Sequence, residues 1–166
     1  MRTSLLLPLA LVAALGACSG DDAPTTFTDA ISAMDAGDAS KAAGDHDAAQ
    51  AGYQYALDNG DDSLKGDAMT GIFEVNVAAG DQDAAVSSFE RLSKEFASNL
   101  TQAELSRLVD VAVLAKMDVL GEAMLGYAIT TYPEMKDSLA KASEAIELIK
   151  TSGPGVDLSG LGYAGD

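Results

Sequence analysis

A short motif that recurs at a fixed distance constrains the fold of this chain more than any other feature. The segment 44–49, with the sequence GDHDAA, returns as the segment 80–85, with the sequence GDQDAA, so the two glycines lie 36 residues apart. In each copy an aromatic residue, Tyr53 or Phe89, follows the second alanine by four residues. A period of this length is typical of helical repeats, in which one helix pair cannot bury its apolar face alone and stacks on a neighbour.

Each copy of the motif combines the end of one helix with the start of the next. The glycine can adopt the left-handed conformation that closes a helix. The first aspartate can cap the following helix, and the second adds negative charge to its first turn. The second alanine, Ala49 or Ala85, is small enough to let two helices approach closely, and we expect the aromatic residue one turn later to share the same buried face.

The motif resembles the turn between the two helices of the tetratricopeptide repeat. The positions that match are Gly44, Ala49, Tyr53 and Ala56 in the first copy, and Gly80, Ala85 and Phe89 in the second. A third unit matches less closely, with Asp118 at the glycine position, followed by Ala123, Tyr127 and Pro133. The resemblance covers about residues 27–133. It implies an all-α, tetratricopeptide-like solenoid of about three helical hairpins plus a C-terminal capping helix, over residues 27–150; a generic antiparallel helical bundle is the alternative.

Apolar spacing and capping residues predict where several helices begin and end. The first pair is expected over about 28–43 and 44–58, and the next helix is expected to start with Ser63 as its cap. Residues 101–104 match the capping-box pattern, and a last helix is expected to start at Pro133. That helix carries a stripe formed by Met135, Leu139, Ala142, Ile146 and Ile149. The glycine-rich segment 151–166 is expected to be a flexible tail.

The N-terminus has the pattern of a targeting segment. Arg2 precedes an apolar run, 5–15, that is too short to span a membrane as a mature helix. The run ends in Leu15-Gly16-Ala17-Cys18, which resembles the bacterial lipobox. The resemblance implies a signal peptide over 1–17 and a lipidated tether over 18–26, with the lipid on Cys18. A membrane-inserted N-terminus with a chance cysteine is the alternative.

This targeting segment implies a lipid anchor in a bacterial cell envelope. Cys18 is the only cysteine in the chain, and its lipidation would account for a thiol that has no partner for a disulfide. Ser19 follows it, where the lipoprotein class in enteric bacteria uses aspartate for inner-membrane retention, so the outer membrane is favoured. The membrane itself is therefore one expected partner, reached through the lipid.

The chain is strongly acidic, with a formal net charge of −16. This charge argues against binding nucleic acid, which requires basic groups that neutralise phosphates. It also argues against lying flat on an anionic lipid surface. A cationic partner is compatible with the charge, and so is an acidic surface that serves only solubility.

No combination of residues in the sequence indicates a catalytic, cofactor or metal site. His46 is the only histidine and lies in an inter-helix turn, and there is no phosphate-binding or dinucleotide-binding motif. Asp58, Asp61 and Asp62 suggest calcium, but their spacing departs from the EF-hand pattern and they are better explained as helix caps. We therefore expect a protein that is not an enzyme and needs no cofactor.

The family resemblance suggests where a partner would bind. In tetratricopeptide repeats the ligand lies on a concave face lined by the first helix of each pair. That face would carry Met34, Asp38 and Lys41 from the first pair and Asp67, Thr70, Glu74 and Val77 from the second. Asp38 and Glu74 occupy equivalent positions in the two repeats.

The expected function is that of an envelope adaptor or scaffold. An acidic face of this kind would suit a basic or extended segment of another envelope protein. Two other functions stay open, an envelope enzyme with a carboxylate-based site and a calcium- or ligand-binding module. An acidic face that only meets solvent is the remaining alternative.

Overall fold

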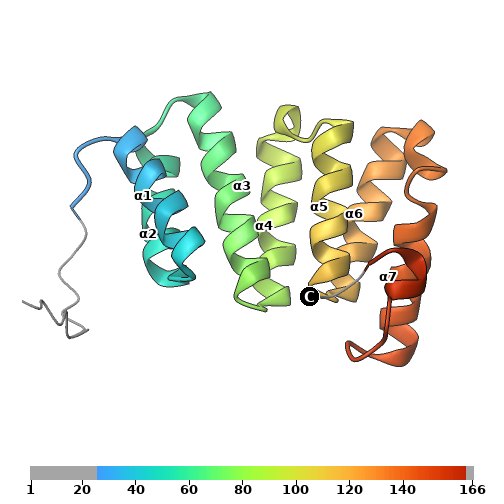
Figure 1. Ribbon diagram of the computed structural model, residues 1–166. Coiled ribbons are helices and arrows are strands. Elements are labelled where there is room, and N and C mark those ends of the chain that lie inside the picture. Colours follow the sequence, from blue (N-terminus) through green and yellow to red (C-terminus); the bar gives the residue numbers. More distant parts are fainter. Residues whose placement is uncertain (1–25, 164–166) are drawn as a thin grey trace, which may run out of the picture.

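The computed structural model describes residues 26–163, and this part of the chain is all-α. The predicted signal peptide, lipobox and Cys18 therefore lie outside the described residues. The described part contains seven α-helices and three short 3₁₀ helices (Figure 1). The α-helices are α1 (Ala30–Ala43), α2 (His46–Asn59), α3 (Asp62–Ala78), α4 (Gln82–Glu95), α5 (Gln102–Leu114), α6 (Asp118–Thr131) and α7 (Ala140–Ser152). None of them is long and apolar enough to cross a membrane.

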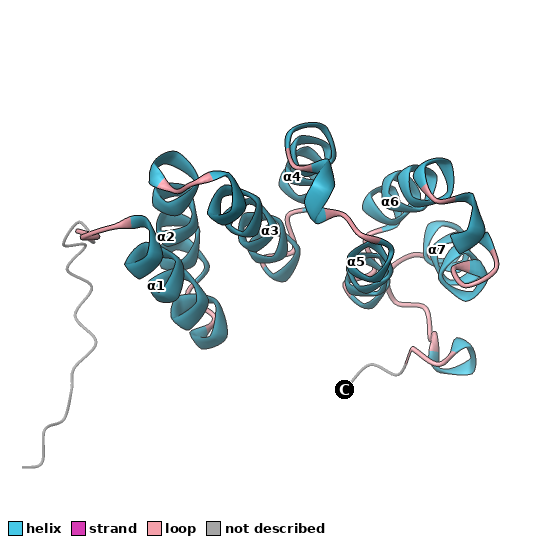
Figure 2. Cartoon of the chain, turned by 90° about the horizontal axis from the view of Figure 1, so that it is seen from above, coloured by secondary structure: helices cyan, strands magenta, loops and turns pink. Residues whose placement is uncertain are grey.

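The helices pack in sequential antiparallel pairs, which confirms the predicted helical-hairpin arrangement. α1 packs on α2, α3 on α4 and α5 on α6, and each pair follows the previous one along a row (Figure 1). Seen from above, α1, α3 and α5 lie along the inner side of the curved row, and α2, α4 and α6 lie along its outer side (Figure 2). We call the side lined by α1, α3 and α5 the inner face.

The repeat extends to the third pair with the same period. The outer helices α2, α4 and α6 begin at His46, Gln82 and Asp118, so each start lies 36 residues after the one before. Two residues ahead of each start the backbone is left-handed, with φ of 76° at Gly44, 76° at Gly80 and 57° at Lys116. In all three turns the next residue donates its N–H to the carbonyl oxygen five residues earlier, over 2.9 to 3.0 Å.

The predicted alignment of the third repeat was therefore wrong by two residues. Lys116, and not Asp118, occupies the glycine position, and Ala123 is exposed. Gly121 takes the place of the small alanine, because a Cβ there would lie 2.6 Å from Cδ1 of Ile146 on α7. Tyr127 still packs into the shared core, with its ring edge-on to Phe89 at 5.7 Å between centroids.

The first two repeats pack as predicted. Ala49 and Ala85 are fully buried, and Tyr53 and Phe89 are 0% and 3% exposed. Tyr53 lies directly against α3, where a Cβ on Gly71 would come within 2.7 Å of the tyrosine ring. Small residues on one helix thus make room for an aromatic ring on its neighbour, and this arrangement holds the first pair against the second.

Several helix starts differ from the prediction. Asp61 rather than Ser63 caps α3, accepting the backbone N–H of Leu64 at 2.9 Å. Thr101 caps α5 as expected, but Glu104 turns its side chain to Arg107, so only half of the capping box forms. The segment Pro133–Lys136 is a separate 3₁₀ helix, and α7 begins later, at Ala140.

The C-terminal segment covers the end of the row and then turns back. The predicted stripe from Met135 to Ile149 is buried, so α7 caps the third pair as expected. The described part of the segment predicted to be a flexible tail makes contacts with the helices. Leu158 is 4% exposed, and Tyr163 donates a hydrogen bond to Asp110 of α5 at 2.7 Å. Tertiary contacts order a segment whose composition alone predicts disorder.

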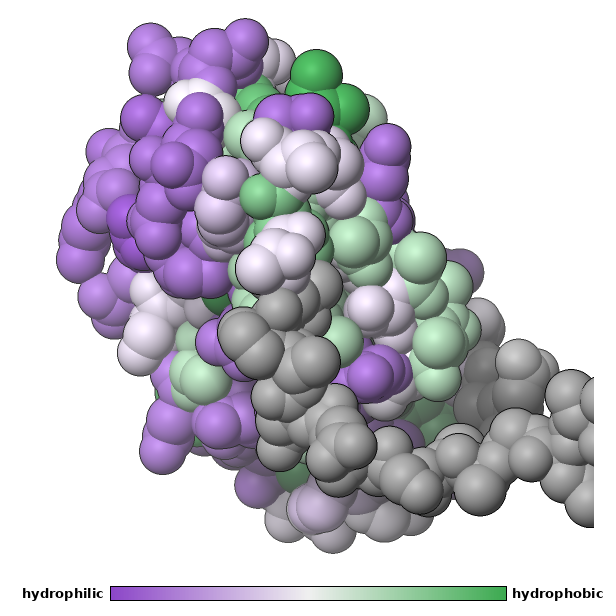
Figure 3. Space-filling view, turned by 90° about the vertical axis from the view of Figure 1, so that its left-hand side faces the viewer, coloured by the Kyte–Doolittle hydropathy of each residue, from purple (hydrophilic) through white to green (hydrophobic). Residues whose placement is uncertain are grey.

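The opposite end of the row has no equivalent of α7 among the described residues. Phe27 packs against Tyr55 there, with ring centroids 5.2 Å apart, and Ile31 on α1 is 67% exposed. The space-filling view of this end shows hydrophilic residues gathered on one side and neutral to hydrophobic residues on the other (Figure 3). The α1 end of the row therefore has one hydrophilic side and one neutral to hydrophobic side.

Candidate functional site

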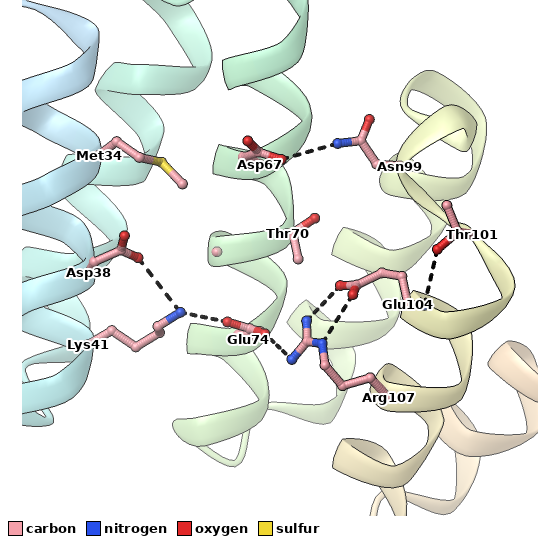
Figure 4. A pocket seen from close by; sticks show the side chains of 11 residues that line it. Met34, Asp38, Lys41, Asp67, Thr70, Glu74, Asn99, Thr101, Glu104 and Arg107 are labelled. Carbon is pink, nitrogen blue, oxygen red and sulfur yellow. Dashed lines mark hydrogen bonds and ion pairs between the residues drawn. The ribbon is translucent and has the colours of Figure 1, made fainter.

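A polar groove crosses the inner face between α1, α3 and α5 (Figure 4). Its hollow measures about 400 Å³. The residues that line it are Met34, Asp38, Lys41, Asp67, Thr70, Gly71, Glu74, Asn99, Thr101, Glu104 and Arg107. Four of these side chains are acidic and two are basic, so the groove carries a net negative charge. We call this feature the central groove.

Glu74 lies at the centre of an ion-pair network that joins all three inner helices. Its Oε2 accepts a hydrogen bond from Nζ of Lys41 on α1 at 2.6 Å. Its Oε1 pairs with a terminal nitrogen of Arg107 on α5, also at 2.6 Å. A single carboxylate on α3 thus connects the first pair to the third, as the dashed lines in Figure 4 show.

The surroundings of Glu74 favour its charged form. Burial by itself raises the pKa of this carboxyl, because it removes water from the charge. The hydrogen bonds and positive charges of Lys41 and Arg107 act in the opposite direction and outweigh burial, so the pKa lies below its ordinary value of 4.5. The network is therefore built around a negative charge at neutral pH.

Arg107 is held on its other side by Glu104. Two of its nitrogens reach the two carboxylate oxygens of Glu104, at 2.6 and 3.1 Å. This forked contact fixes the plane of the guanidinium group. The hydrogen bonds that Arg107 donates to Glu104 are the main reason that the pKa of Arg107 is raised, so its charge is permanent. Arg107 is thus positioned before any partner arrives.

Asp38 lies at the α1 side of the central groove. Its Oδ1 accepts a hydrogen bond from the buried Tyr53 hydroxyl at 2.6 Å, and Nζ of Lys41 lies 3.9 Å away. Burial, followed by this hydrogen bond to Asp38, raises the pKa of Tyr53, so its hydroxyl remains a donor. The side chain of Asp38 is still 57% exposed, which leaves carboxylate surface for a partner.

Asp67 lies closer than Glu74 to the N-terminal end of α3, near the start of α5. It is exposed and accepts one hydrogen bond, from the Asn99 side chain at 3.3 Å. Thr70 is partly buried one turn later and bonds back to the carbonyl of Gly66. Asp38 and Asp67 are thus the two groove carboxylates with the most surface directed to solvent.

Most of the predicted partner-binding residues meet in this groove. Asp38, Asp67, Thr70 and Glu74 all line it, as do Met34 and Lys41. Val77 does not, because it is only 5% exposed and belongs to the core. Three residues along a helix correspond to a rotation of about 300°, which turns Val77 about 60° away from Glu74 and towards the buried side.

The prediction missed the residues that α5 contributes. Glu104 and Arg107 line the central groove, and Asp110 lies one turn further along the same helix. Asp110 follows Glu74 by the same 36 residues that separate Glu74 from Asp38. Counting that period from Glu74 would have found it, but the misplaced third repeat concealed the match. We call Asp38, Glu74 and Asp110 the acid ladder.

The structure offers no arrangement for a metal in the described part of the chain. Across residues 26–163, no group of three or more His, Cys, Asp or Glu side chains is placed to hold an ion. Of the aspartates considered for calcium, Asp61 caps α3 and Asp58 accepts a hydrogen bond from Gln54. Both aspartates therefore have structural partners of their own.

Comparisons with family models, with curated proteins and with solved structures gave no match to this chain. The arrangement of the inner face is therefore what supports a functional proposal.

Proposed function

We propose that this protein is a lipid-anchored adaptor of a bacterial cell envelope, which binds a basic, extended segment of another envelope protein along its inner face. The anchor is the lipid on Cys18, and the outer membrane is its favoured location. The helical hairpins resemble tetratricopeptide repeats, whose concave side holds peptide ligands. The role that we propose is non-catalytic.

The observation that carries this proposal is the acid ladder together with the shape of the central groove. Acidic residues recur at equivalent positions of three successive repeats, on the side of the row where a segment can lie across α1, α3 and α5. A chain that runs across the inner helices would pass an acid in each repeat, although Glu74 is already paired with Lys41 and Arg107. Repetition of this kind suits an extended ligand better than a small compact one.

The ion pairs define which carboxylates a partner would contact first. Glu74 is already bound by Lys41 and Arg107, so its main role is to hold the inner helices in place. Asp38 and Asp67 keep exposed carboxylate surface at either side of it. A lysine or arginine of the partner would therefore bind at Asp38 and Asp67, while Glu74 keeps the groove in shape.

The test is capture of the partner from the protein's own membranes at low and at high salt. The double variant Asp38→Asn with Asp67→Asn removes the exposed groove charges and nearly keeps the side-chain size. It should reduce the captured partner and flatten the salt dependence, because attraction between exposed charges is screened by salt. The matched control is Glu144→Gln with Glu147→Gln on α7, which removes the same charge from an exposed surface elsewhere.

The outcomes separate the adaptor from its alternatives. Equal yields from the wild type, the groove variant and the control would mean that the acidic inner face meets only solvent. A loss that is the same in the groove variant and in the control would indicate a general charge effect. A melting temperature that rises with calcium would instead support a calcium-binding module.

A further inference from the structure

The segment after α7 returns to the inner face and packs against α5. Residues 153–163 include the 3₁₀ helix Ser159–Leu161 and lie on the inner side of the row, beside α5 and α7 (Figure 2). Leu158 is 4% exposed and is the main apolar anchor of the segment. Two hydrogen bonds complete the contact, one from Lys116 Nζ to the Val156 carbonyl at 2.9 Å and one from the Tyr163 hydroxyl to Asp110 at 2.7 Å. We call residues 153–163 the return segment.

The carboxylate that the return segment contacts is the third member of the acid ladder. In the first repeat the tyrosine hydroxyl that bonds to Asp38 comes from α2, which is part of the repeat itself. In the third repeat the hydroxyl that bonds to Asp110 comes from Tyr163, beyond the last helix. The return segment therefore occupies a position on the inner face that the repeat does not fill on its own.

The contact surface around the return segment combines polar and apolar groups. A hollow of about 260 Å³ lies between the return segment and the end of α5, lined in part by Val113, Leu114 and Lys116. Leu114 is 54% exposed beside it, so part of this apolar surface is not covered by the chain. A segment with one apolar side chain and one hydroxyl donor fits this place, and the return segment supplies both.

The contact between the return segment and α5 is small compared with the length of chain that it must order. One buried leucine, three partly buried side chains (Val156, Leu161 and Tyr163) and two hydrogen bonds oppose the loss of conformational entropy of a glycine-rich segment, and such contributions are of similar size. The return segment lies after α7 and belongs to none of the helix pairs. Release of the segment therefore does not require the helix pairs to separate.

We propose that the return segment is a displaceable occupant of the inner face, and that a partner segment with an apolar residue followed by a tyrosine takes its place at Asp110. This inference rests on the proposed binding function. It describes how the return segment controls the access of a partner to the third repeat. In the closed state Tyr163 and Leu158 cover the site. In the open state the partner's tyrosine donates to Asp110, and its apolar side chain replaces Leu158.

A synthetic peptide with the sequence of residues 153–163 tests this exchange on the full chain. The peptide carries a fluorescent label, and its binding is followed by anisotropy. In the wild type the attached segment competes with the peptide. The apparent affinity is therefore the intrinsic affinity multiplied by the fraction of molecules in the open state. Leu158→Asp in the protein should release the attached segment and tighten peptide binding about tenfold or more. Adding Asp110→Asn to that protein, or Tyr163→Phe to the peptide, should weaken binding several-fold.

Three results would overturn the proposal. The first is peptide binding that does not saturate in any of the proteins. The second is equal affinity of the wild type and Leu158→Asp. The third is loss of helical circular dichroism in Leu158→Asp, which would make the segment a fixed part of the core. None of these measurements uses the envelope partner, so failure of partner capture at the central groove and failure of this exchange are separate results.

Discussion

Lys116 occupies the same place in the third repeat as Gly80 in the second. Both backbones are left-handed, with φ of 57° and 76°, and both end an inner helix two residues before an outer helix begins. A side chain in this conformation costs about 1–2 kcal/mol relative to glycine, because its Cβ approaches the following carbonyl oxygen. Ala112 and Leu120 on either side of the turn are fully buried, and we infer that packing of the two helices offsets this cost.

The first prediction concerns these turns. Gly80→Ala should lower the free energy of unfolding by about 1–2 kcal/mol, since φ is 76° and nothing lies within 4 Å of the new Cβ. The loss would come from backbone conformation alone. Urea denaturation measures it, with Gly126→Ala as the control. Gly126 lies inside α6 with open space around it, so alanine there should stabilise the protein by about 0.5–1 kcal/mol.

The second prediction concerns the close approach of α1 and α2. A Cβ on Gly52 would lie 2.6 Å from the carbonyl oxygen of Ala33 and 2.9 Å from the amide nitrogen of Gly37. Backbone atoms cannot move aside as a flexible side chain can, so Gly52→Ala should cost about 1–3 kcal/mol through overpacking. The same urea titration measures the loss. If Gly52→Ala were as stable as Gly126→Ala, the helices would not be in contact at this point.

The sequence predicted the first two repeats well because both turns carry the residues that the geometry needs. Gly44 and Gly80 match the left-handed position, and Asp45 and Asp81 cap the next helix. In the third repeat Lys116 and Met117 occupy these two positions, and Met117 makes no side-chain cap. Local residue preference therefore pointed to Asp118, while the packing of α5 and α6 determined the actual turn.

The same difference between local residue preference and tertiary packing explains which residues of the central groove the sequence predicted. The inner face of α1 and α3 followed from the repeat, so Asp38 and Glu74 were found. Arg107, which pairs with Glu74, has no counterpart in the earlier repeats, where Gly71 and Asp35 occupy the equivalent positions. The return segment could not be predicted either, because its glycine content indicates flexibility and only its contacts with α5 order it.

The third prediction concerns the anchor. Cys18→Ser removes the sulfur that the lipid would be attached to, so the variant should remain an unlipidated precursor. Labelling with a radioactive fatty acid, followed by membrane fractionation, measures both consequences. A variant that is still processed and held in the membrane like the wild type would contradict the lipoprotein assignment. Replacing Ser19 by Thr is a suitable control, because it leaves the cysteine in place.

The last prediction concerns pH and the role of Glu74. Its pKa in the folded protein lies below its ordinary value of 4.5, so the unfolded chain binds more protons between these two values. The stability that Glu74 contributes is therefore complete above that window and is lost as the pH falls through the folded pKa. Glu74→Gln removes the charge that Lys41 and Arg107 share, and it should lower the free energy of unfolding by about 1–3 kcal/mol at neutral pH.

Measuring this stability difference as a function of pH separates the ion-pair network from other effects of the substitution. From about pH 7 to about pH 3, the gap between the wild type and Glu74→Gln should narrow, because protonation of Glu74 in the wild type breaks the same pairs. Other carboxylates titrate in both proteins and cancel in the difference. Glu144→Gln, an exposed position on α7, should track the wild type throughout. A gap for Glu74→Gln that stays constant across this range would mean that the lost stability comes from packing, and that the charge on Glu74 does not hold the inner helices together.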